Sequence, residues 1–435
     1  MKTALWQTFL SVTCLCWWSG QAAAGKRFEL SVEAGRHDRL NVPVRAALEL
    51  PAELADARAV LLRDEQGNQI PAQLTDPCLL DLPAKDSPRP PAGEGQGVRA
   101  AGGRAVGQLH FVLPRLQQGQ SLTLTAEVST DGPKPGGFAW KDTPGQYAEL
   151  SYASRPVMRY VYLSPEAAKK EGDTIFKVYH HLYDPAGKRL VTKGERTGLF
   201  PHHRGLFFGF SRISYGDVKG VNTWGAGGDH CQSHEGFLAE EAGPVLGRHR
   251  VAVDWHGQGN QVFAKEQREL TAYHVPGGVL VEFASRLSSA VGKVRLDGDP
   301  QHAGFHFRAA QDVADNAKAT YYLRPDGKDQ PGKTRNWDHK TRDPRCVNLP
   351  WNAVSFLIDQ RRYTVVYLDH PANPKEARYS ERDYGRFGSY FEYELDDGKD
   401  LVVRYRIWLQ EGEMSVEQAA ALSADFVEPP LVRVK

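Results

Sequence analysis

Short runs in which apolar and polar residues alternate recur along almost the whole chain after residue 25. Clear examples are 28–32, 108–113, 251–255, 279–283 and 401–409. A period of two places successive side chains on opposite faces of a strand, and the Gly- and Pro-containing segments between the runs are typical of turns. Helical periodicity is confined to short stretches at 165–171 and 415–422. The pattern predicts an all-β protein built from antiparallel sandwiches.

Two Pro- and Gly-rich stretches suggest how the chain is divided. The stretch 83–104 interrupts the first group of strands, and 131–145 follows that group. We expect a small accessory β-sandwich over 25–130, a linker over 131–146, and a large antiparallel β-sandwich, supersandwich-like, over 147–435. The clusters of residues that could carry chemistry all lie in the large sandwich, so we place the functional site there.

The N-terminus has the features of a secretory signal peptide. Lys2 precedes an apolar stretch from Ala4 to about Trp18, and the small residues 22–24 suit cleavage after Ala24. We therefore expect residues 1–24 to be removed and the protein to be exported to the periplasm or the extracellular space. The apolar stretch is short for a membrane span, and no later segment approaches one, so no integral membrane segment is expected.

Charge and cysteine content narrow the class further. The chain has 54 Lys and Arg and 53 Asp and Glu, a net charge of +1. It therefore shows no excess of positive charge of the kind that binds nucleic acid. Cys78, Cys231 and Cys346 remain after the signal peptide, an odd number at long spacings. The chain is therefore no disulfide scaffold, and one bridge or none are both open.

The densest group of candidate residues is the run 201–210, which contains His202, His203 and Arg204. If the run is a strand, His202 and Arg204 share one face and His203 takes the other, which leaves open which histidine faces a site. The alternative is a buried strand whose histidines only satisfy hydrogen bonds. Two adjacent histidines and an arginine are costly to bury without a purpose, so we favour the functional interpretation.

A second group, at 227–236, contains His230 and His234 among glycines. On a helix, histidines four residues apart are a common zinc-ligand pair, but the glycines disfavour a helix. With His370, these two histidines are our candidates for a divalent metal ion, the one cofactor considered. A solvated polar loop is the alternative interpretation.

Two further groups follow. The stretch 297–308 contains His302, His306 and Arg308. If both histidines lie on one strand, the four-residue step between them separates them by roughly 13 Å, which is too far for both to ligate one ion. They could share an ion only if His302 lies in the turn before the strand. The stretch 367–388 contains a rigid loop directly after an apolar strand, a common place for a site. Its candidate residues are Asp369, His370, Arg382 and Tyr384.

Several of these stretches resemble a family common in planctomycetes and Bacteroidetes that is often labelled "methane oxygenase PmoA". The shared blocks are PHHRGLFFGF at 201–210, Asn222-Thr223-Trp224, Val253-Asp254-Trp255, LDHPANP at 368–374 and RDYGRFG at 382–388. The resemblance covers about 150–412 and implies a secreted protein associated with sugar-processing enzymes. The label implies no methane oxidation, because this chain lacks the membrane spans of such a subunit. Many relatives have an acidic residue near 301–302, where this chain has Gln301 and His302.

Together these features predict an exported carbohydrate-active enzyme that cleaves a glycosidic bond by hydrolysis or elimination, oxidised (keto) sugars included. Histidine can move a proton near neutral pH, and arginine can hold an oxyanion or carboxylate. The predicted catalytic residues are His203, His306 and His202. The predicted substrate-binding residues are Arg204, Arg308, Arg382, Tyr384, Trp224, His302 and Asp369.

Two other classes of function stay open. A non-catalytic glycan-binding protein would show an exposed aromatic platform, and a metal-dependent redox protein would show a compact set of ligands. An enzyme of the predicted kind would group three or more of the histidines in one concave pocket.

Overall fold

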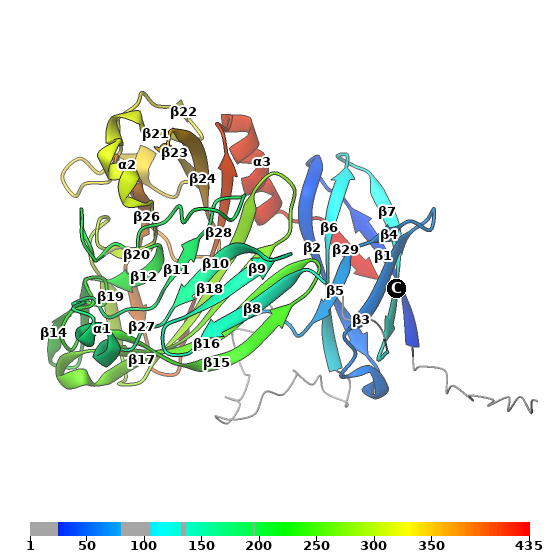
Figure 1. The fold of residues 1–435 in the computed structure, drawn as a ribbon, viewed down its shortest axis with the longest axis horizontal. Helices are drawn as coiled ribbons and strands as arrows, with labels where there is room; N and C mark the ends of the chain where they lie inside the picture. The colour runs from blue at the N-terminus through cyan, green and yellow to red at the C-terminus, as the bar shows by residue number, and fades with distance from the viewer. Residues whose placement is uncertain (1–24, 80–104, 132–135, 195) are drawn as a thin grey trace, which may run out of the picture.

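The computed structural model describes residues 25–79, 105–131, 136–194 and 196–435. The expected signal peptide over 1–24 and the Pro- and Gly-rich stretch 83–104 lie outside these ranges. Within them the protein is all-β, as predicted, with two β-sandwich modules side by side (Figure 1). The described residues contain three α-helices: α1 (Pro165–Lys170), α2 (Gln311–Asp315) and α3 (Val416–Val427). Short 3-10 helices occur at Ala52–Leu54, Gln258–Asn260, Ala317–Ala319 and Pro344–Cys346.

The small module packs two sheets face to face. Its five-stranded sheet has the order β29 (Leu431–Val434), β1 (Gly25–Glu33), β7 (Ser121–Ser129), β3 (Ala59–Asp64) and β4 (Gln69–Ile70). Its three-stranded sheet has the order β2 (Arg39–Leu50), β6 (Ala105–Leu116) and β5 (Ala72–Thr75). Alternate residues such as Leu30 and Val32 of β1 and Leu109 and Phe111 of β6 are fully buried in its core. The period-two pattern of the sequence thus fixes which face of each strand is covered.

The large module is built from two long antiparallel sheets and a smaller third one. The eight-stranded sheet runs β25 (Arg378–Arg382), β26 (Arg386–Tyr390), β20 (Ala303–Arg308), β12 (Leu206–Phe210), β11 (Tyr179–Leu182), β10 (Arg155–Val161), β9 (Tyr147–Tyr152) and β8 (Phe138–Thr143). The nine-stranded sheet runs β15 (Gln232–Ala242), β16 (Leu246–His256), β17 (Val262–Tyr273), β18 (Val279–Ser289), β28 (Asp400–Glu411), β24 (Arg361–Asp369), β23 (Trp351–Ile358), β21 (Tyr321–Arg324) and β22 (Gly327–Lys328). The four-stranded sheet runs β14 (Val218–Val221), β13 (Arg212–Tyr215), β19 (Val294–Asp297) and β27 (Tyr393–Leu395).

Aromatic side chains join the two long sheets in one core. Phe283 of β18 stacks on Phe305 of β20 with ring centroids 4.2 Å apart, and Tyr405 of β28 stacks on the same ring at 4.8 Å. Phe208 of β12 also contacts Phe283. All four side chains are buried, and each contributes about 1.5–3 kcal/mol through loss of contact with water. This core fixes β12 and β20; His306 lies on β20, and His202, His203 and His302 lie in the turns that precede the two strands.

The strands differ from the expected module boundaries at two places. β8 lies inside the stretch expected to be a linker, and it pairs with β9 at the edge of the eight-stranded sheet. β29 comes after the large module in sequence but pairs with β1 of the small module, with Leu30 opposite Val434 (Figure 1). Such long-range pairing has no local signal in the sequence.

Helix α3 and the chain on either side of it connect the two modules. Ser415 and Gln418 form a capping box that starts the helix. Asp425 of α3 pairs with Arg39 of β2 at 2.7 Å, and both side chains are nearly inaccessible. Because a buried charge is costly unless it is paired, this contact fixes the helix against the small module.

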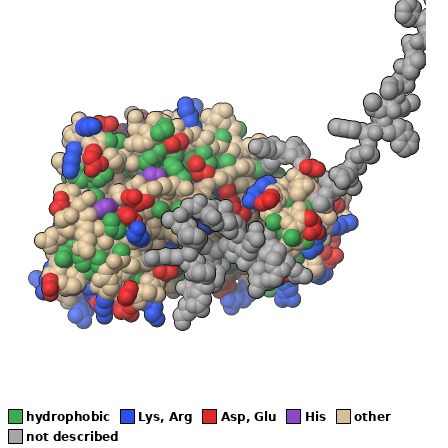
Figure 2. Space-filling model, turned by 90° about the horizontal axis from the view of Figure 1, so that it is seen from below, with side chains coloured by type: hydrophobic (Ala, Val, Ile, Leu, Met, Phe, Trp, Pro, Cys, Tyr) green, Lys and Arg blue, Asp and Glu red, His purple; other side chains and the backbone are tan. Residues whose placement is uncertain are grey.

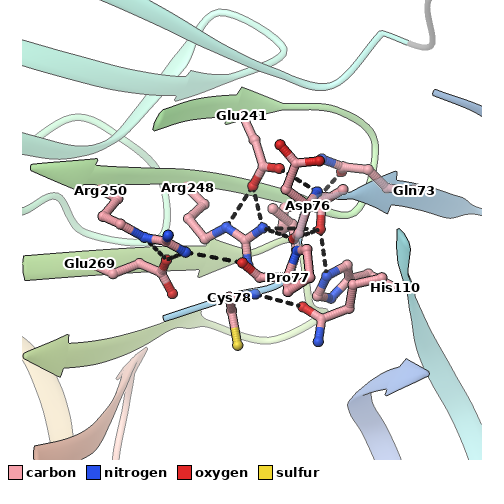
Figure 3. Close-up of polar contacts among 12 residues, drawn as sticks. Gln73, Asp76, Pro77, Cys78, His110, Glu241, Arg248, Arg250 and Glu269 are labelled. Atoms are coloured by element: carbon pink, nitrogen blue, oxygen red, sulfur yellow. Dashed lines mark hydrogen bonds and ion pairs between the residues drawn. The ribbon is translucent and has the colours of Figure 1, made fainter. Parts of the chain in front are cut away.

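A buried polar network forms a second connection between the modules (Figure 3). Arg248 of β16 donates hydrogen bonds to Glu241 of β15 at 2.6 Å, to the Asp76 carbonyl at 2.6 Å and to Thr75 Oγ1 at 3.0 Å. The Asp76 amide in turn donates to Glu241 at 2.9 Å. Arg248 is 3% exposed, so these bonds form away from water.

The network continues two residues further along β16. Arg250 donates to the Pro77 carbonyl at 3.0 Å and to Glu269 of β17 at 2.8 Å. Glu269 also accepts from the Leu79 amide at 3.0 Å. The segment after β5 is therefore held to the nine-stranded sheet by its backbone (Figure 3).

Three other features bear on the class of protein. Cys78, Cys231 and Cys346 are buried, and no disulfide joins them in the described structure. Positive and negative side chains are mixed over the described surface shown in Figure 2. None of the helices among the described residues combines the length and the apolar character needed to cross a membrane.

Candidate functional site

The candidate site lies on the face of the eight-stranded sheet that points away from the main core. On β12, Leu206 and Phe208 belong to that core, whereas Phe207 points to the opposite face. His306 of β20 is opposite Phe207 in register. Trp224, from the loop after β14, covers both, with ring centroids 4.5 Å from Phe207 and 4.7 Å from His306. Alternation along two strands thus builds an aromatic layer of Phe207, His306 and Trp224, which we call the floor of the site.

The turn before β12 brings two histidines over this floor. The strand begins only at Leu206, so the alternation expected for His202, His203 and Arg204 does not apply. Gly205 adopts a φ of +52°, and a Cβ there would lie 2.0 Å from the His180 carbonyl oxygen. Only glycine fits such a close approach with a positive φ, and the chain therefore turns back over the sheet.

Arg204 holds this turn in place. Its guanidinium forms two hydrogen bonds to Asp173, at 2.6 and 2.8 Å, and its Nε donates to the Pro201 carbonyl at 3.0 Å. Both partners of the ion pair are buried. The predicted substrate-binding arginine thus positions the turn that carries His202 and His203.

His302 completes a group of three histidines. It lies in the turn before β20, and one ring nitrogen each of His202, His203 and His302 lie within 4.8 Å of one another. His302 Nδ1 is hydrogen-bonded to Asp299 at 3.0 Å. This is the one group of at least three potential metal-ligating side chains among the described residues.

A pocket of about 470 Å³ opens beside the three histidines. His202, His302, Trp224 and Asn222 are among the residues that line it. The others are Ile175, Ser211, Gly225 and Asp299. The pocket therefore offers an indole, an imidazole pair and several small hydrogen-bonding groups to a ligand.

His203 is the most unusual member of the group. It is 2% exposed, and neither of its ring nitrogens has a hydrogen-bond partner among the described residues. An unsatisfied buried polar atom costs about 1–3 kcal/mol, so such an arrangement needs an explanation. Burial and then the charge of Arg386 lower the pKa of His203 well below 6.5, and burial and Lys177 lower the pKa of His202 to about 4. Both rings are neutral at pH 7 and keep a free lone pair.

His306, the other predicted acid/base, is fully occupied. Its Nε2 donates to the Ala303 carbonyl at 2.9 Å, and its Nδ1 accepts from Arg386 at 3.2 Å. These two bonds fix one neutral tautomer, and burial followed by the charge of Arg386 lowers the pKa well below 6.5. In this structure His306 supports the floor of the site and has no nitrogen left for a substrate.

The remaining predicted substrate-binding residues mainly hold loops. Arg308 donates to the Ala309 carbonyl at 3.0 Å and to the Leu199 carbonyl at 3.4 Å, and lies over the Tyr384 ring at 4.7 Å. Tyr384 packs beside Phe200 with ring centroids 5.3 Å apart. Arg382 donates to Asn336 at 2.6 Å. Arg308, Arg382 and Tyr384 are not among the residues that line the pocket.

The residues predicted to bind a metal ion are not brought together. His230 accepts a hydrogen bond from the Asn222 amide at 3.2 Å, so it supports the loop that carries Trp224. His234 lies on β15, where Tyr160 and Tyr162 contact it. A glycine-rich loop followed by a strand therefore replaces the helix on which the two histidines would be neighbours.

His370 and Asp369 belong to another part of the fold, at the end of β24. His370 packs on Phe426 of α3 with ring centroids 5.2 Å apart. Asp369 accepts from Asn373 at 2.6 Å and pairs with Lys375 at 3.3 Å. Burial raises the pKa of the Asp369 carboxyl, which these partners partly offset. The loop after β24 therefore packs against helix α3 through His370.

Three residues that the sequence did not single out stand next to the site. Asp299 orients His302, and Arg386 bonds His306. Lys177 is buried, donates to the Trp224 carbonyl and lies over the Phe207 ring at 4.4 Å. Burial lowers the pKa of Lys177 well below 10.5, with the charge of Arg204 contributing. Asp299 and Arg386 stand in motifs that the sequence marked, but Lys177 lies in an ordinary apolar run without a signal.

The fold and the pocket together define a two-module all-β protein with a histidine-lined pocket on the outer face of its larger sandwich. The chain belongs to DUF6807, a family of unknown function whose model matches residues 147–424. No curated protein matches the chain by sequence.

Two solved structures are similar to this chain at low identity. One is an α-mannosidase from Enterococcus faecalis V583, with a TM-score of 0.43 and 8% identity over 94% of this chain and 46% of that chain. The other is a protein in glycosyl hydrolase family 38 from Enterococcus faecalis, with a TM-score of 0.44 and 7% identity over 94% of this chain and 47% of that chain. This chain therefore spans about half the length of either protein.

Proposed function

We propose that the protein is an exported carbohydrate-active enzyme that cleaves a glycosidic bond at the pocket beside His202, His203 and His302. The observation that carries the proposal is the convergence of three histidines, two of which, His202 and His302, line one pocket. A catalyst needs reactive groups gathered around its substrate, whereas a non-catalytic binding surface does not.

The lining of the pocket suits a sugar. Trp224 supplies an apolar aromatic surface, and its buried Nε1 has no hydrogen-bond partner among the described residues. Asn222 and Ser211 supply neutral donors and acceptors at the same pocket. Pyranose rings combine an apolar face with several hydroxyl groups, so indole and small polar groups are their usual partners. An oxidised (keto) sugar adds a carbonyl that neighbouring cations can polarise.

Of the two predicted catalytic residues His203 and His306, only His203 has ring nitrogens left for a further role at the site. Both of its nitrogens lack partners, whereas those of His306 are both bonded. Hydrolysis and elimination both require a group that handles a proton or activates water at the reacting carbon.

The proposal is tested by expressing residues 25–435 and screening plain and 3-keto glycosides for released sugar. We expect turnover that is lost in His302→Ala and retained in His234→Ala, because His234 lies on β15 among tyrosines. Trp224→Phe keeps an aromatic ring but removes the N–H and part of the indole surface, so it should raise KM more than it lowers kcat. Sugar-dependent thermal stabilisation without any turnover would indicate a glycan-binding protein instead.

A metal-dependent redox reaction is the second candidate, favoured by the compact arrangement of the three histidines. The same screen separates it from the first, because oxidation changes the sugar without releasing a leaving group.

A further inference from the structure

The three histidines have the geometry of a nearly assembled metal site. Their nearest ring nitrogens lie within 4.8 Å of one another. Two nitrogens bound to one tetrahedral Zn²⁺ ion at 2.0–2.1 Å are roughly 3.4 Å apart. His202 and His302 are partly exposed, so rotation of their side chains by about 1 Å at the nitrogen closes the set.

Asp299 prepares His302 for this role. Its carboxylate lies 3.0 Å from His302 Nδ1, which leaves Nε2 for an ion. Metal-ligating histidines usually donate their other ring N–H to a carboxylate, which fixes the tautomer and strengthens the ligand. Asp299 also supplies a negative charge beside the three imidazoles.

His203 provides an independent indication. It is 2% exposed, contacts His202 with ring centroids 4.2 Å apart, and has two unpartnered nitrogens among the described residues. A bound cation would satisfy one of these nitrogens in a place where water has little access. Three imidazoles with no carboxylate ligand favour Zn²⁺, Co²⁺, Ni²⁺ or Cu²⁺ over Mg²⁺ and Ca²⁺.

We propose that His202, His203 and His302 bind one divalent transition-metal ion of the Zn²⁺ class, with Asp299 as the positioning residue. His202 and His302 also line the 470 Å³ pocket, so the fourth coordination position is open to a ligand, as in catalytic rather than structural zinc sites. Such an ion lowers the pKa of a bound water and polarises a carbonyl. This catalytic use rests on the proposed function, whereas binding of the ion does not.

The test uses residues 25–435 without a polyhistidine tag, stripped with a chelator and titrated with Zn²⁺ by calorimetry. We expect one Zn²⁺ per chain, and a Co²⁺ derivative with visible absorption bands of a low-coordinate site. His302→Ala should lose stoichiometric binding; its side chain is 41% exposed, so the fold should tolerate the change. Asp299→Asn should weaken binding about 10–100-fold. The matched controls His234→Ala and His370→Ala should bind like the parent.

Three results would overturn the proposal: no Zn²⁺ bound by the parent, equal binding by the parent and His302→Ala, or loss of binding in His234→Ala. Circular dichroism of each variant confirms that the fold is retained. Glycoside cleavage by stripped protein that binds no Zn²⁺ would refute the proposed metal site and would still support the proposed function. Zn²⁺ binding without cleavage of any glycoside would uphold the metal site and count against the proposed function.

Discussion

The buried arginine between the modules gives the sharpest prediction about stability. Arg248→Met keeps a side chain of similar length but removes the charge that faces Glu241, together with the donors to Asp76 and Thr75. Removing one partner of a buried ion pair costs about 3–5 kcal/mol, because the other charge is left unpaired. Burial already raises the pKa of Glu241, so protonation of this carboxyl limits the loss. We therefore expect about 3–5 kcal/mol at pH 8 and less at pH 5.

The distribution of tryptophan provides the assay. Residues 25–131 contain no Trp, whereas the large module contains six, so fluorescence reports the large module and far-UV circular dichroism reports both. Urea unfolding of the parent should give coincident transitions by both probes, and Arg248→Met should separate them as the small module unfolds first.

Two variants control this experiment. Arg36→Met removes an ion pair to Glu428 in which Arg36 is 79% exposed, and should cost less than about 1 kcal/mol. Arg248→Met combined with Glu241→Gln should recover part of the loss, because no unpaired charge remains. If Arg248→Met behaves like Arg36→Met, the reasoning about the buried network is wrong.

Three further predictions follow from other contacts. Glu282 pairs with Arg406 at 2.6 Å, and the charges of Arg406 and Arg45 outweigh burial and hold the pKa of Glu282 below 4.5. Glu282→Gln should therefore lower the free energy of unfolding by about 1–3 kcal/mol at pH 7. The difference in stability between the parent and Glu282→Gln, measured by urea unfolding from pH 7 to pH 3, should shrink as the pH falls below about 4.5. A difference that stays constant over this range would contradict the assigned role of the Glu282 carboxylate. Gly205→Ala should displace the turn with the histidines and reduce Zn²⁺ affinity at least tenfold in calorimetry, whereas Gly119→Ala, also at positive φ but in open space, should not. Removing residues 431–435 should speed hydrogen exchange in β1, and unchanged exchange there would show that β29 does not protect it.

The class of fold could be predicted from the sequence because it depends on local alternation. Phe305 and Phe307 alternate with His306 along the chain, and the structure buries the two phenylalanines in the core and turns the histidine to the other face. The pairing of β29 with β1 could not be predicted, because it depends on which distant edge is left uncovered after the rest has folded.

The site could be predicted only in part, for the same reason. The sequence marked His202, His203 and His302 separately, but their meeting depends on a turn that folds back at Gly205 and on His302 lying before β20. The sequence also does not show that Arg204, a predicted substrate-binding residue, is paired with Asp173. A local sequence pattern therefore identifies which residue types are present, but it does not show which residues from distant parts of the chain meet in the fold.

The position of β29 also sets the order in which the protein can be completed during synthesis. The strand is translated after every strand of the large module, yet it covers the outer edge of β1. Until then the unpaired backbone groups of β1 are open to pairing with another chain. A nascent chain that stalls before residues 431–434 are made therefore leaves the β1 edge unpaired and open to aggregation.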